Sequence, residues 1–494
     1  MKKIKHFFPF ILLFIILAVN AYLLSFNAFR YFNFYDMGDF LDGGWRIYIG
    51  QKPYRDFLFY PCPLHFYMLA FFFHIFGVGK TAFLAHIMVV SSIVIAGIFV
   101  MLWKRVPLIF TALVSVLTLV SFYWPSSHPW YDHSAHLWGI LALTLLIIAR
   151  PFKQPRDCLY AAMFCGLMAV LSFFTKSNIG TIYVLMFFVF WIVHPNRWQA
   201  LGGYCLGGLL GLGIMHGIVG FDKNFFEHSV WLTSRIQATL NPADWGVNFY
   251  WIPLALVLPL ALRHLKICRD LLILFIGMTI NGIFAALTGN MIRDVNFLLW
   301  GPQLALAFLI LYAIKNELTV RWEKIFYYFN ITSLIVLSVF FIRLGFQAGL
   351  NLRMWTHRFE DVKTNYVIQT PPLQGWNSQR RQGTAHDRIA NFINTRIPKS
   401  DTLFVMNDMH ALYAMTQRDS YRGVPLFISD AFPPAGRHRG YTRERLLSHL
   451  PDWIVLDFDS FNHELLHFDI RKEILFHYQP VAEYGSCLII KKVR

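Results

Sequence analysis

The run FFPFILLFIILAVNAYLL (7–24) decides the class of fold, because it contains no charged residue over its whole length. An uncharged stretch of about 20 residues can cross the hydrocarbon core of a bilayer as one helix. It follows the basic segment MKKIKH (1–6), as a secretory signal would. The run is longer than the apolar region of about 7–15 residues in such signals, and no clear small-residue cleavage site follows it. We therefore expect an uncleaved first transmembrane helix.

Similar apolar runs recur through most of the chain. Of the 494 residues, 56% are hydrophobic and only 15% are charged, whereas a soluble domain carries about 25% charged residues. A bilayer is the natural solvent for so much apolar surface. We predict a polytopic α-helical membrane protein with about eleven transmembrane helices. The predicted spans are 7–28, 82–103, 106–123, 134–149, 157–175, 179–194, 199–220, 249–262, 270–288, 296–314 and 325–345.

The net charge of +16 is a signal of membrane orientation rather than of nucleic-acid binding. Cytoplasmic loops carry an excess of Lys and Arg, and a cytoplasmic N-terminus puts most basic residues on that side. The inner loops would then hold Lys2, Lys3, Lys5, Lys104, Arg105, Arg150, Lys153, Arg156, Arg197, Arg263, Lys266, Arg269, Lys315, Arg321 and Lys324. The short outer loops would hold only Lys176, Lys223, Arg235 and Arg293. This bias predicts that the residues after the last helix lie outside the cytoplasm.

The segment PLHFYMLAFFFHIFG (63–77) allows two interpretations. If it crossed the membrane, every later loop would be reversed and the basic clusters would lie outside. It is short for a membrane span and contains His65 and His74. We interpret it as a helix in the outer interface, so that residues 29–80 form one long outer loop.

A glycine-rich apolar segment, GGYCLGGLLGLG (202–213), contains the small-xxx-small pattern Gly203, Gly207 and Gly211. Within an apolar run, this pattern predicts close helix packing rather than a nucleotide-binding loop.

The composition changes after residue 345 to the balance of acidic and basic residues that is usual in soluble domains. Turn-forming residues in 346–384 predict a linker with loops. From 385 to 494, predicted helices alternate with short apolar strands such as TLFVM (402–406) and WIVLD (453–457). This pattern predicts a small extracytoplasmic α/β domain.

Acidic residues in the outer loops are the first candidates for chemistry, because ionisable groups beside a membrane cavity are functional candidates by default. Three of them, Asp36, Asp39 and Asp42, lie in YDMGDFLDGGWRIYIGQKPYRDF (35–57), directly after the first helix. Their spacing of three residues would place them on roughly one face of a helix. Capping of the helix start is the alternative role for each carboxylate.

These features together resemble the GT-C superfamily of membrane glycosyltransferases. The resemblance extends over most of the chain as short patterns, and is greatest to bacterial protein O-mannosyltransferases and lipid A aminoarabinose transferases. It is carried by Asp36 after the first helix, PYRDF (53–57), the apolar 63–77, WYDHSAHLWGILA (130–142) and FFTKSNIG (173–180). The usual Asp-Glu pair of the family is absent, because Met37 follows Asp36. That difference leaves the two-acid mechanism and the donor open.

The resemblance implies an inverting enzyme of the bacterial inner membrane. Such an enzyme moves a sugar from a polyprenyl-phosphate donor to a hydroxyl of a lipid, glycan or protein on the outer side. A carboxylate must take the hydroxyl proton, which contributes about 10²–10⁴-fold to the rate. Asp36 matches the family position of this base, and Asp132 is a candidate second active-site carboxylate. The predicted substrate-binding residues are Lys176, Lys52, Arg55, Arg293 and Asp39.

Other roles are open for several of these residues. Lys176 could extend to the headgroups as an interfacial lysine, and Arg55 and Arg293 could each pair with the aspartate that follows it. His128, His133 and His136 are metal-ligand types, but their spacing matches no established zinc motif. No cofactor is certain, and a divalent metal is left open.

Two other functions remain as alternatives to a transferase. A flippase or transporter for a lipid-linked glycan often shows internal repeats, and this sequence shows none. An O-antigen ligase or polymerase would act in the same compartment.

Overall fold

A computed structural model describes most of the chain, in two compact units. The described residues are 2–28, 30–34, 36–59, 62–150, 154–227, 249–288, 298–350, 365–405, 409–423, 446–457 and 476–493. The helical unit comprises Met1–Asn27, Ile87–Ile218 and Leu240–His357, and the mixed unit comprises Ala28–His86, Val219–Thr239 and Arg358–Arg494.

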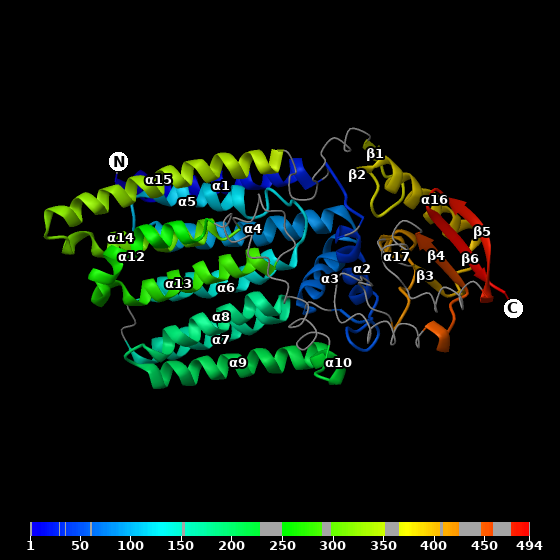
Figure 1. Cartoon of the computed structure of the whole chain (residues 1–494), viewed down its shortest axis with the longest axis horizontal. Helices are drawn as coiled ribbons and strands as arrows, with labels where there is room; N and C mark the ends of the chain where they lie inside the picture. Colours follow the sequence, from blue (N-terminus) through cyan, green and yellow to red (C-terminus); the bar gives the residue numbers. More distant parts are fainter. Residues whose placement is uncertain are drawn as a thin grey trace. The chain divides into compact units, whose positions relative to one another are not determined.

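The helical unit is built from long helices that lie side by side (Figure 1). The helices, some of which extend a few residues into the other unit, are α1 (Lys2–Ala28), α4 (Lys80–Leu102), α5 (Leu108–Ser121), α6 (Tyr131–Ala149), α7 (Pro155–Thr175), α8 (Ser177–Ile192), α9 (Arg197–Val219), α12 (Trp251–Arg263), α13 (Leu265–Thr288), α14 (Trp300–Ile314), η3 (Lys315–Glu317) and α15 (Arg321–Leu350). Most are apolar on all sides, which suits helices that satisfy their own backbone hydrogen bonds in lipid.

Seven helices of the described residues are long and apolar enough to cross a membrane. They are the apolar part of α1 (Phe7–Ala28), α4, α6, α7, α9, the apolar part of α13 (Leu265–Ala285) and α15. Each of the eleven predicted spans overlaps one helix of this unit. The chain is therefore a multi-pass membrane protein, while the number of eleven spans and the orientation stay predictions.

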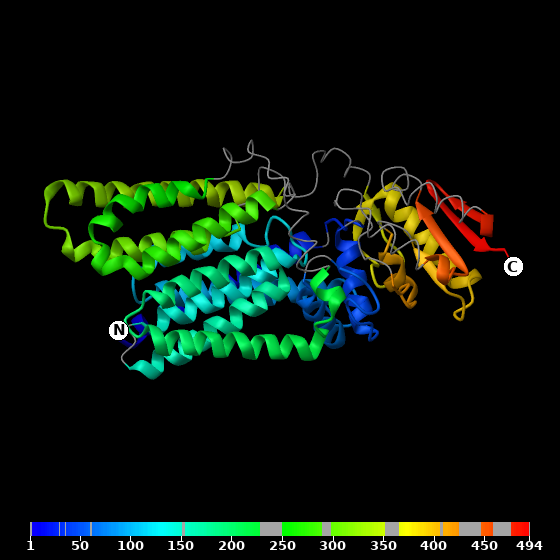
Figure 2. The same ribbon diagram turned by 60° about the horizontal axis from the view of Figure 1, so that its bottom comes forward.

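The glycine stripe of α9 packs against α7. Both helices belong to the set of long helices that the turned view of Figure 2 shows again. A Cβ added at Gly203 would lie 2.3 Å from the backbone oxygen of Leu159. One added at Gly207 would lie 1.8 Å from the backbone oxygen of Met163. Only glycine permits this approach of the two backbones, so the predicted close packing is confirmed.

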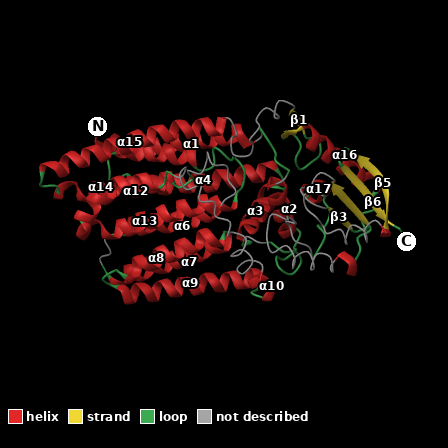
Figure 3. Ribbon diagram, viewed as in Figure 1, coloured by secondary structure: helices red, strands yellow, loops and turns green. Residues whose placement is uncertain are grey.

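The mixed unit contains all the named strands of the described residues, as Figure 3 shows. Its elements are α2 (Asp36–Tyr48), α3 (Leu64–Phe76), α10 (Lys223–Phe225), β1 (Asn365–Val367), β2 (Asn377–Gln379), α16 (Arg380–Arg396), β3 (Leu403–Val405), α17 (Ala411–Thr416), β4 (Trp453–Asp457), β5 (Tyr478–Tyr484) and β6 (Cys487–Lys492). Strands β1 and β2 form an antiparallel pair. The larger sheet has the order β3-β4-β6-β5, with β3 parallel to β4 and the other pairs antiparallel.

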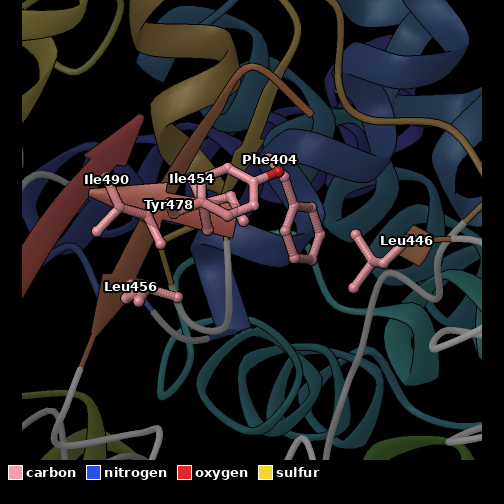
Figure 4. Packing of buried hydrophobic residues seen from close by; sticks show 6 residues of the cluster. All are labelled: Phe404, Leu446, Ile454, Leu456, Tyr478 and Ile490. Atoms are coloured by element: carbon pink, nitrogen blue, oxygen red, sulfur yellow. The ribbon is translucent and has the colours of Figure 1, made fainter. Parts of the chain in front are cut away.

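The larger sheet buries an apolar core (Figure 4). Strand β4 lies between β3 and β6, and its first four residues are buried. A nearly continuous apolar strand such as WIVL is what this central position requires. The core residues are Phe404, Leu446, Ile454, Leu456, Tyr478 and Ile490. The predicted small α/β domain is thus present after the last long helix.

The region predicted as a linker, 346–384, contains regular structure. Helix α15 continues to Leu350, β1 and β2 pair with each other, and α16 begins at Arg380 rather than at residue 385. The polar start of α16 has no apolar periodicity, so no sequence pattern marks its first turn. The sequence also predicts helices over 441–450 and 461–476. The first half of the former and almost all of the latter lie outside the described residues.

Two glycines bring α2 and α3 into close contact within the mixed unit. A Cβ added at Gly43 would lie 2.3 Å from the Phe66 ring, and one at Gly44 would lie 2.7 Å from the Phe73 ring. Helix α3 therefore supports α2 directly. Its other side exposes Phe71 and neighbouring apolar residues, which suits the predicted position at a membrane interface.

Candidate functional site

Helix α2 carries the three acidic residues that the sequence singled out. It begins at Asp36, and Asp36 and Asp39 both lie in its first turn. Carboxylates are stabilised there by the unsatisfied backbone N–H groups and the positive end of the helix dipole. The three aspartates thus lie on one helix, as expected, but their carboxylates differ in burial and in partners.

Asp42 and Arg46 form an ion pair that is sealed inside the mixed unit. Both residues are 0% exposed, and Arg46 Nε lies 2.7 Å from Asp42 Oδ2. The Ser420 hydroxyl donates a hydrogen bond to Asp42 Oδ1 at 2.5 Å. Arg46 Nη1 donates to the backbone oxygen of Tyr421 at 2.9 Å. The Gln51 side-chain amide donates to the backbone oxygen of Ser420 at 2.7 Å. These bonds join the first loop of the chain to a segment near residue 420.

Asp39 is buried as well, whereas Asp36 is only half-buried. Asp39 Oδ1 lies 2.8 Å from Nδ1 of His410, which is also buried. Asp36 Oδ2 accepts a hydrogen bond from the neutral amide of Asn33 at 3.2 Å. The carboxylates of Asp39 and Asp42 thus hold structural positions, and that of Asp36 lies nearer the surface at the helix start.

Asp56 forms a second charged cluster in the same loop. Arg55 lies 2.7 Å from its carboxylate and Arg422 lies 3.5 Å away, while the Lys52 backbone N–H donates to Oδ2 at 2.8 Å. Partial burial raises the pKa of Asp56, but the hydrogen bonds from Arg55 and Lys52 and the two cationic charges outweigh it and lower the pKa. The alternative that Arg55 pairs with Asp56 is therefore what the structure shows. The Lys52 side chain is exposed.

Lys176 lies in the helical unit, at the single residue between α7 and α8. Its Nζ lies 2.5 Å from Oδ1 of Asp132, in the first turn of α6, and 4.6 Å from the centre of the Tyr131 ring. Lys176 is 7% exposed and Asp132 is 2% exposed. The interpretation of Lys176 as a lysine extended into the headgroup layer does not fit this burial.

The three candidate metal ligands do not gather around one point. A ring nitrogen of His128 lies 2.6 Å from the backbone oxygen of Ser126. His133 contacts the backbone oxygen of Phe122 at 2.5 Å, and His136 contacts the hydroxyl of Tyr183 at 3.0 Å. No three His, Cys, Asp or Glu side chains form a set of metal ligands in the part of the chain that is described.

The predicted site residues thus fall into three groups. Asp36, Asp39, Lys52 and Arg55 belong to the mixed unit, Asp132 and Lys176 belong to the helical unit, and Arg293 lies outside the described residues. In the structure Asp132 forms an ion pair with Lys176, whereas the sequence predicted a separate role for each residue. Sequence reasoning missed Arg46, although its spacing of four residues from Asp42 on one helix is a local signal of an ion pair. It also missed His410, because nothing in local spacing marks a partner 371 residues away.

The sequence matches no family model and no curated protein. Solved structures do match over nearly the whole chain. ArnT from Cupriavidus metallidurans bound to undecaprenyl phosphate has a TM-score of 0.57 at 12% identity, covering 97% of this chain and 97% of that chain. Its apo state has a TM-score of 0.55 at 13% identity, with the same coverage.

A second protein of known structure matches to a similar degree. AglB, an archaeal oligosaccharyltransferase from Archaeoglobus fulgidus in complex with an inhibitory peptide and a dolichol-phosphate, has a TM-score of 0.53 at 10% identity. The match covers 98% of this chain and 74% of that chain. The chain has the GT-C fold. At these identities the likeness establishes the fold alone, and it confirms the fold that the motifs around Asp36 predicted.

The Arg46→Met variant tests the sealed ion pair. It leaves the Asp42 carboxylate buried without its cation, which costs about 3–5 kcal/mol. We expect a much lower unfolding temperature for the purified protein in detergent, followed by tryptophan fluorescence. The control is Arg55→Met. The Arg55 side chain is 59% exposed, so its removal should leave the unfolding temperature unchanged. Equal unfolding temperatures for Arg46→Met and the unmodified protein would contradict the assignment.

Proposed function

We propose that this protein is a glycosyltransferase of the bacterial inner membrane. It moves a sugar from a polyprenyl-phosphate donor to an acceptor hydroxyl on the outer side, with Asp36 as the general base. The observation that carries the proposal is the half-buried carboxylate of Asp36 at the start of α2, in a chain with the GT-C fold. Asp39 and Asp42 are engaged with His410 and Arg46.

The molecules bound to the structural neighbours support a lipid-linked donor. One neighbour is bound to undecaprenyl phosphate and the other to a dolichol-phosphate, which are both polyprenyl phosphates. The second neighbour is called an oligosaccharyltransferase. Since a fold does not fix a substrate, the sugar and the acceptor are left to experiment.

The transfer step has a simple balance. The acceptor oxygen forms a bond to the anomeric carbon, and the bond from that carbon to the phosphate oxygen breaks. The electron pair of the broken bond stays on the phosphate. The hydroxyl proton passes to the Asp36 carboxylate, which a general base must hold within hydrogen-bond reach. Attack from the side opposite the phosphate inverts the anomeric configuration.

The departing phosphate needs a cation, and we assign this role to Lys176. An ammonium group has three N–H donors, so Lys176 has donors for a phosphate oxygen while it stays paired with Asp132. Asp132 then positions Lys176, in place of the role as second active-site carboxylate that the sequence suggested. Lys52 and Arg55, both exposed cations of the α2–α3 loop, are further candidates for contact with the anionic donor.

Asp36→Asn tests the base. The change keeps the shape of the side chain and its place at the helix start, but removes its ability to take a proton. We expect the consumption of labelled undecaprenyl-phosphate sugars by the reconstituted protein to fall by about 10² or more, with no change in the unfolding temperature. Glu483→Gln is the matched control, because it removes an exposed carboxylate of β5 in the same unit.

The same assay separates the transferase from the alternatives. A flippase would move the labelled lipid across the vesicle membrane intact, whereas a transferase consumes it. Turnover near that of the unmodified protein in Asp36→Asn would reject Asp36 as the base. Transport without consumption would reject the transferase itself.

A second test addresses Lys176. Lys176→Met alone would leave Asp132 buried without a cation, so the test uses the double variant Lys176→Met/Asp132→Asn, in which both partners are neutral. We expect this variant to unfold at the usual temperature but to bind undecaprenyl phosphate about tenfold more weakly or worse, since a charge-assisted hydrogen bond is lost. Lys104→Met removes an exposed lysine of the helical unit and should bind normally. Unchanged affinity in the double variant would make the pair purely structural.

A further inference from the structure

A cavity of about 430 Å³ opens within the mixed unit, and its lining includes neither Asp36 nor the buried ion pair of α2. Its walls come from the first three turns of α16, from the end of β4 and from the turn between β5 and β6. The volume lies within the range of about 300–1,000 Å³ that is usual for small-ligand sites. None of the residues that the proposed function uses lines this cavity.

The lining is strongly cationic. Three arginines, Arg380, Arg381 and Arg388, line the cavity together with one carboxylate, that of Asp457. Arg380 and Arg388 are exposed, and neither forms an ion pair with a carboxylate among the described residues. Arginine is the side chain best suited to hold a carboxylate or phosphate by two parallel hydrogen bonds.

The backbone adds to this positive field. Arg380 and Arg381 form the first turn of α16, a helix of 17 residues, and the N–H groups of a helix start favour anions. The arginines therefore reinforce a preference that the helix already has. The α16 helix does not carry an acidic residue in its first turn to compensate that charge.

His386 is a buried polar side chain in the lining. It lines the cavity, is 3% exposed, and its Nε2 has no hydrogen-bond partner among the described residues. A buried polar atom without a partner costs about 1–3 kcal/mol. This nitrogen is closed to a water-sized probe, so a bound molecule recovers that energy only where the ring turns toward the cavity. Burial lowers the pKa of His386 to about 4, so the ring is neutral at pH 7 and one of its nitrogens can accept a hydrogen bond.

The remaining polar groups suit a sugar better than a bare anion. The Asp457 carboxylate can accept hydrogen bonds from hydroxyl groups, and it would repel a second negative charge. Tyr484, also in the lining, offers an aromatic ring of the kind that packs against the apolar face of a sugar. Cationic and hydroxyl-binding groups thus line the same cavity.

We propose that this cavity binds an anionic saccharide, with its phosphate or carboxylate group at Arg380 and Arg388 and its hydroxyl groups toward Asp457. That the saccharide is part of the acceptor rests on the proposed transferase function. The binding itself does not depend on that function.

The test is calorimetric binding to the full-length protein in detergent, with glucose 6-phosphate, glucose and inorganic phosphate as probes. We expect glucose 6-phosphate to bind at least about tenfold more tightly than either of the other probes, because only it engages both kinds of group. In Arg380→Gln/Arg388→Gln its affinity should fall by about tenfold or more. Arg396→Gln is the matched control, since Arg396 is an exposed arginine in the last turn of the same helix and does not line the cavity.

Three results would overturn the inference: no binding of glucose 6-phosphate, equal binding of inorganic phosphate, or full affinity in the double variant. The Asp36→Asn variant separates this inference from the proposed function, because it should still bind glucose 6-phosphate. Absent sugar transfer with intact binding would contradict only the transferase. Absent binding with intact sugar transfer would contradict only the saccharide site.

Discussion

The buried ion pair between Asp42 and Arg46 is the constraint on which the mixed unit depends. Two charges at 0% exposure lose their hydration, and their mutual attraction offsets that loss only if their other hydrogen-bonding atoms are also satisfied. Ser420, Tyr421 and the neighbouring Gln51 supply these bonds. The loop after the first helix is therefore fixed to a segment nearly 380 residues later in the chain. Neither part could keep this geometry without the other.

This constraint determines how the candidate base is held. Asp36 lies less than two turns before Asp42 on the same helix, and Asp39 between them is tied to His410. Helix α3 supports α2 closely at Gly43 and Gly44. A half-buried carboxylate at the end of such a rigid helix has little freedom to move. Preorganisation of this kind is what a general base requires to meet a hydroxyl in a productive geometry.

The sequence predicted the parts of the structure that depend on local pattern. The lengths of the apolar runs predicted the helices of the helical unit. The spacing of Gly203 and Gly207 predicted close helix packing, which is the contact between α9 and α7. The pairings could not be predicted, because Asp39 with His410 and Asp132 with Lys176 join residues that only the folded chain brings together. Lys176 was the hardest case: a lone cation in a short turn has the same sequence signal whether it faces lipid headgroups or a buried carboxylate. The start of α16 was missed because its first turn is polar.

The central claim is that the loop carrying α2 faces the outside of the cell, where a lipid-linked sugar would be used. The most direct measurement is labelling of Lys52→Cys in intact cells with a membrane-impermeant maleimide. The background is Cys205→Ser, since Cys205 is the exposed cysteine of the six. Lys324→Cys, an exposed position expected on the inner side, is the reference. The account predicts that Lys52→Cys is labelled at once and Lys324→Cys only after the membrane is permeabilised. The reverse pattern would put Asp36 in the cytoplasm and contradict the account.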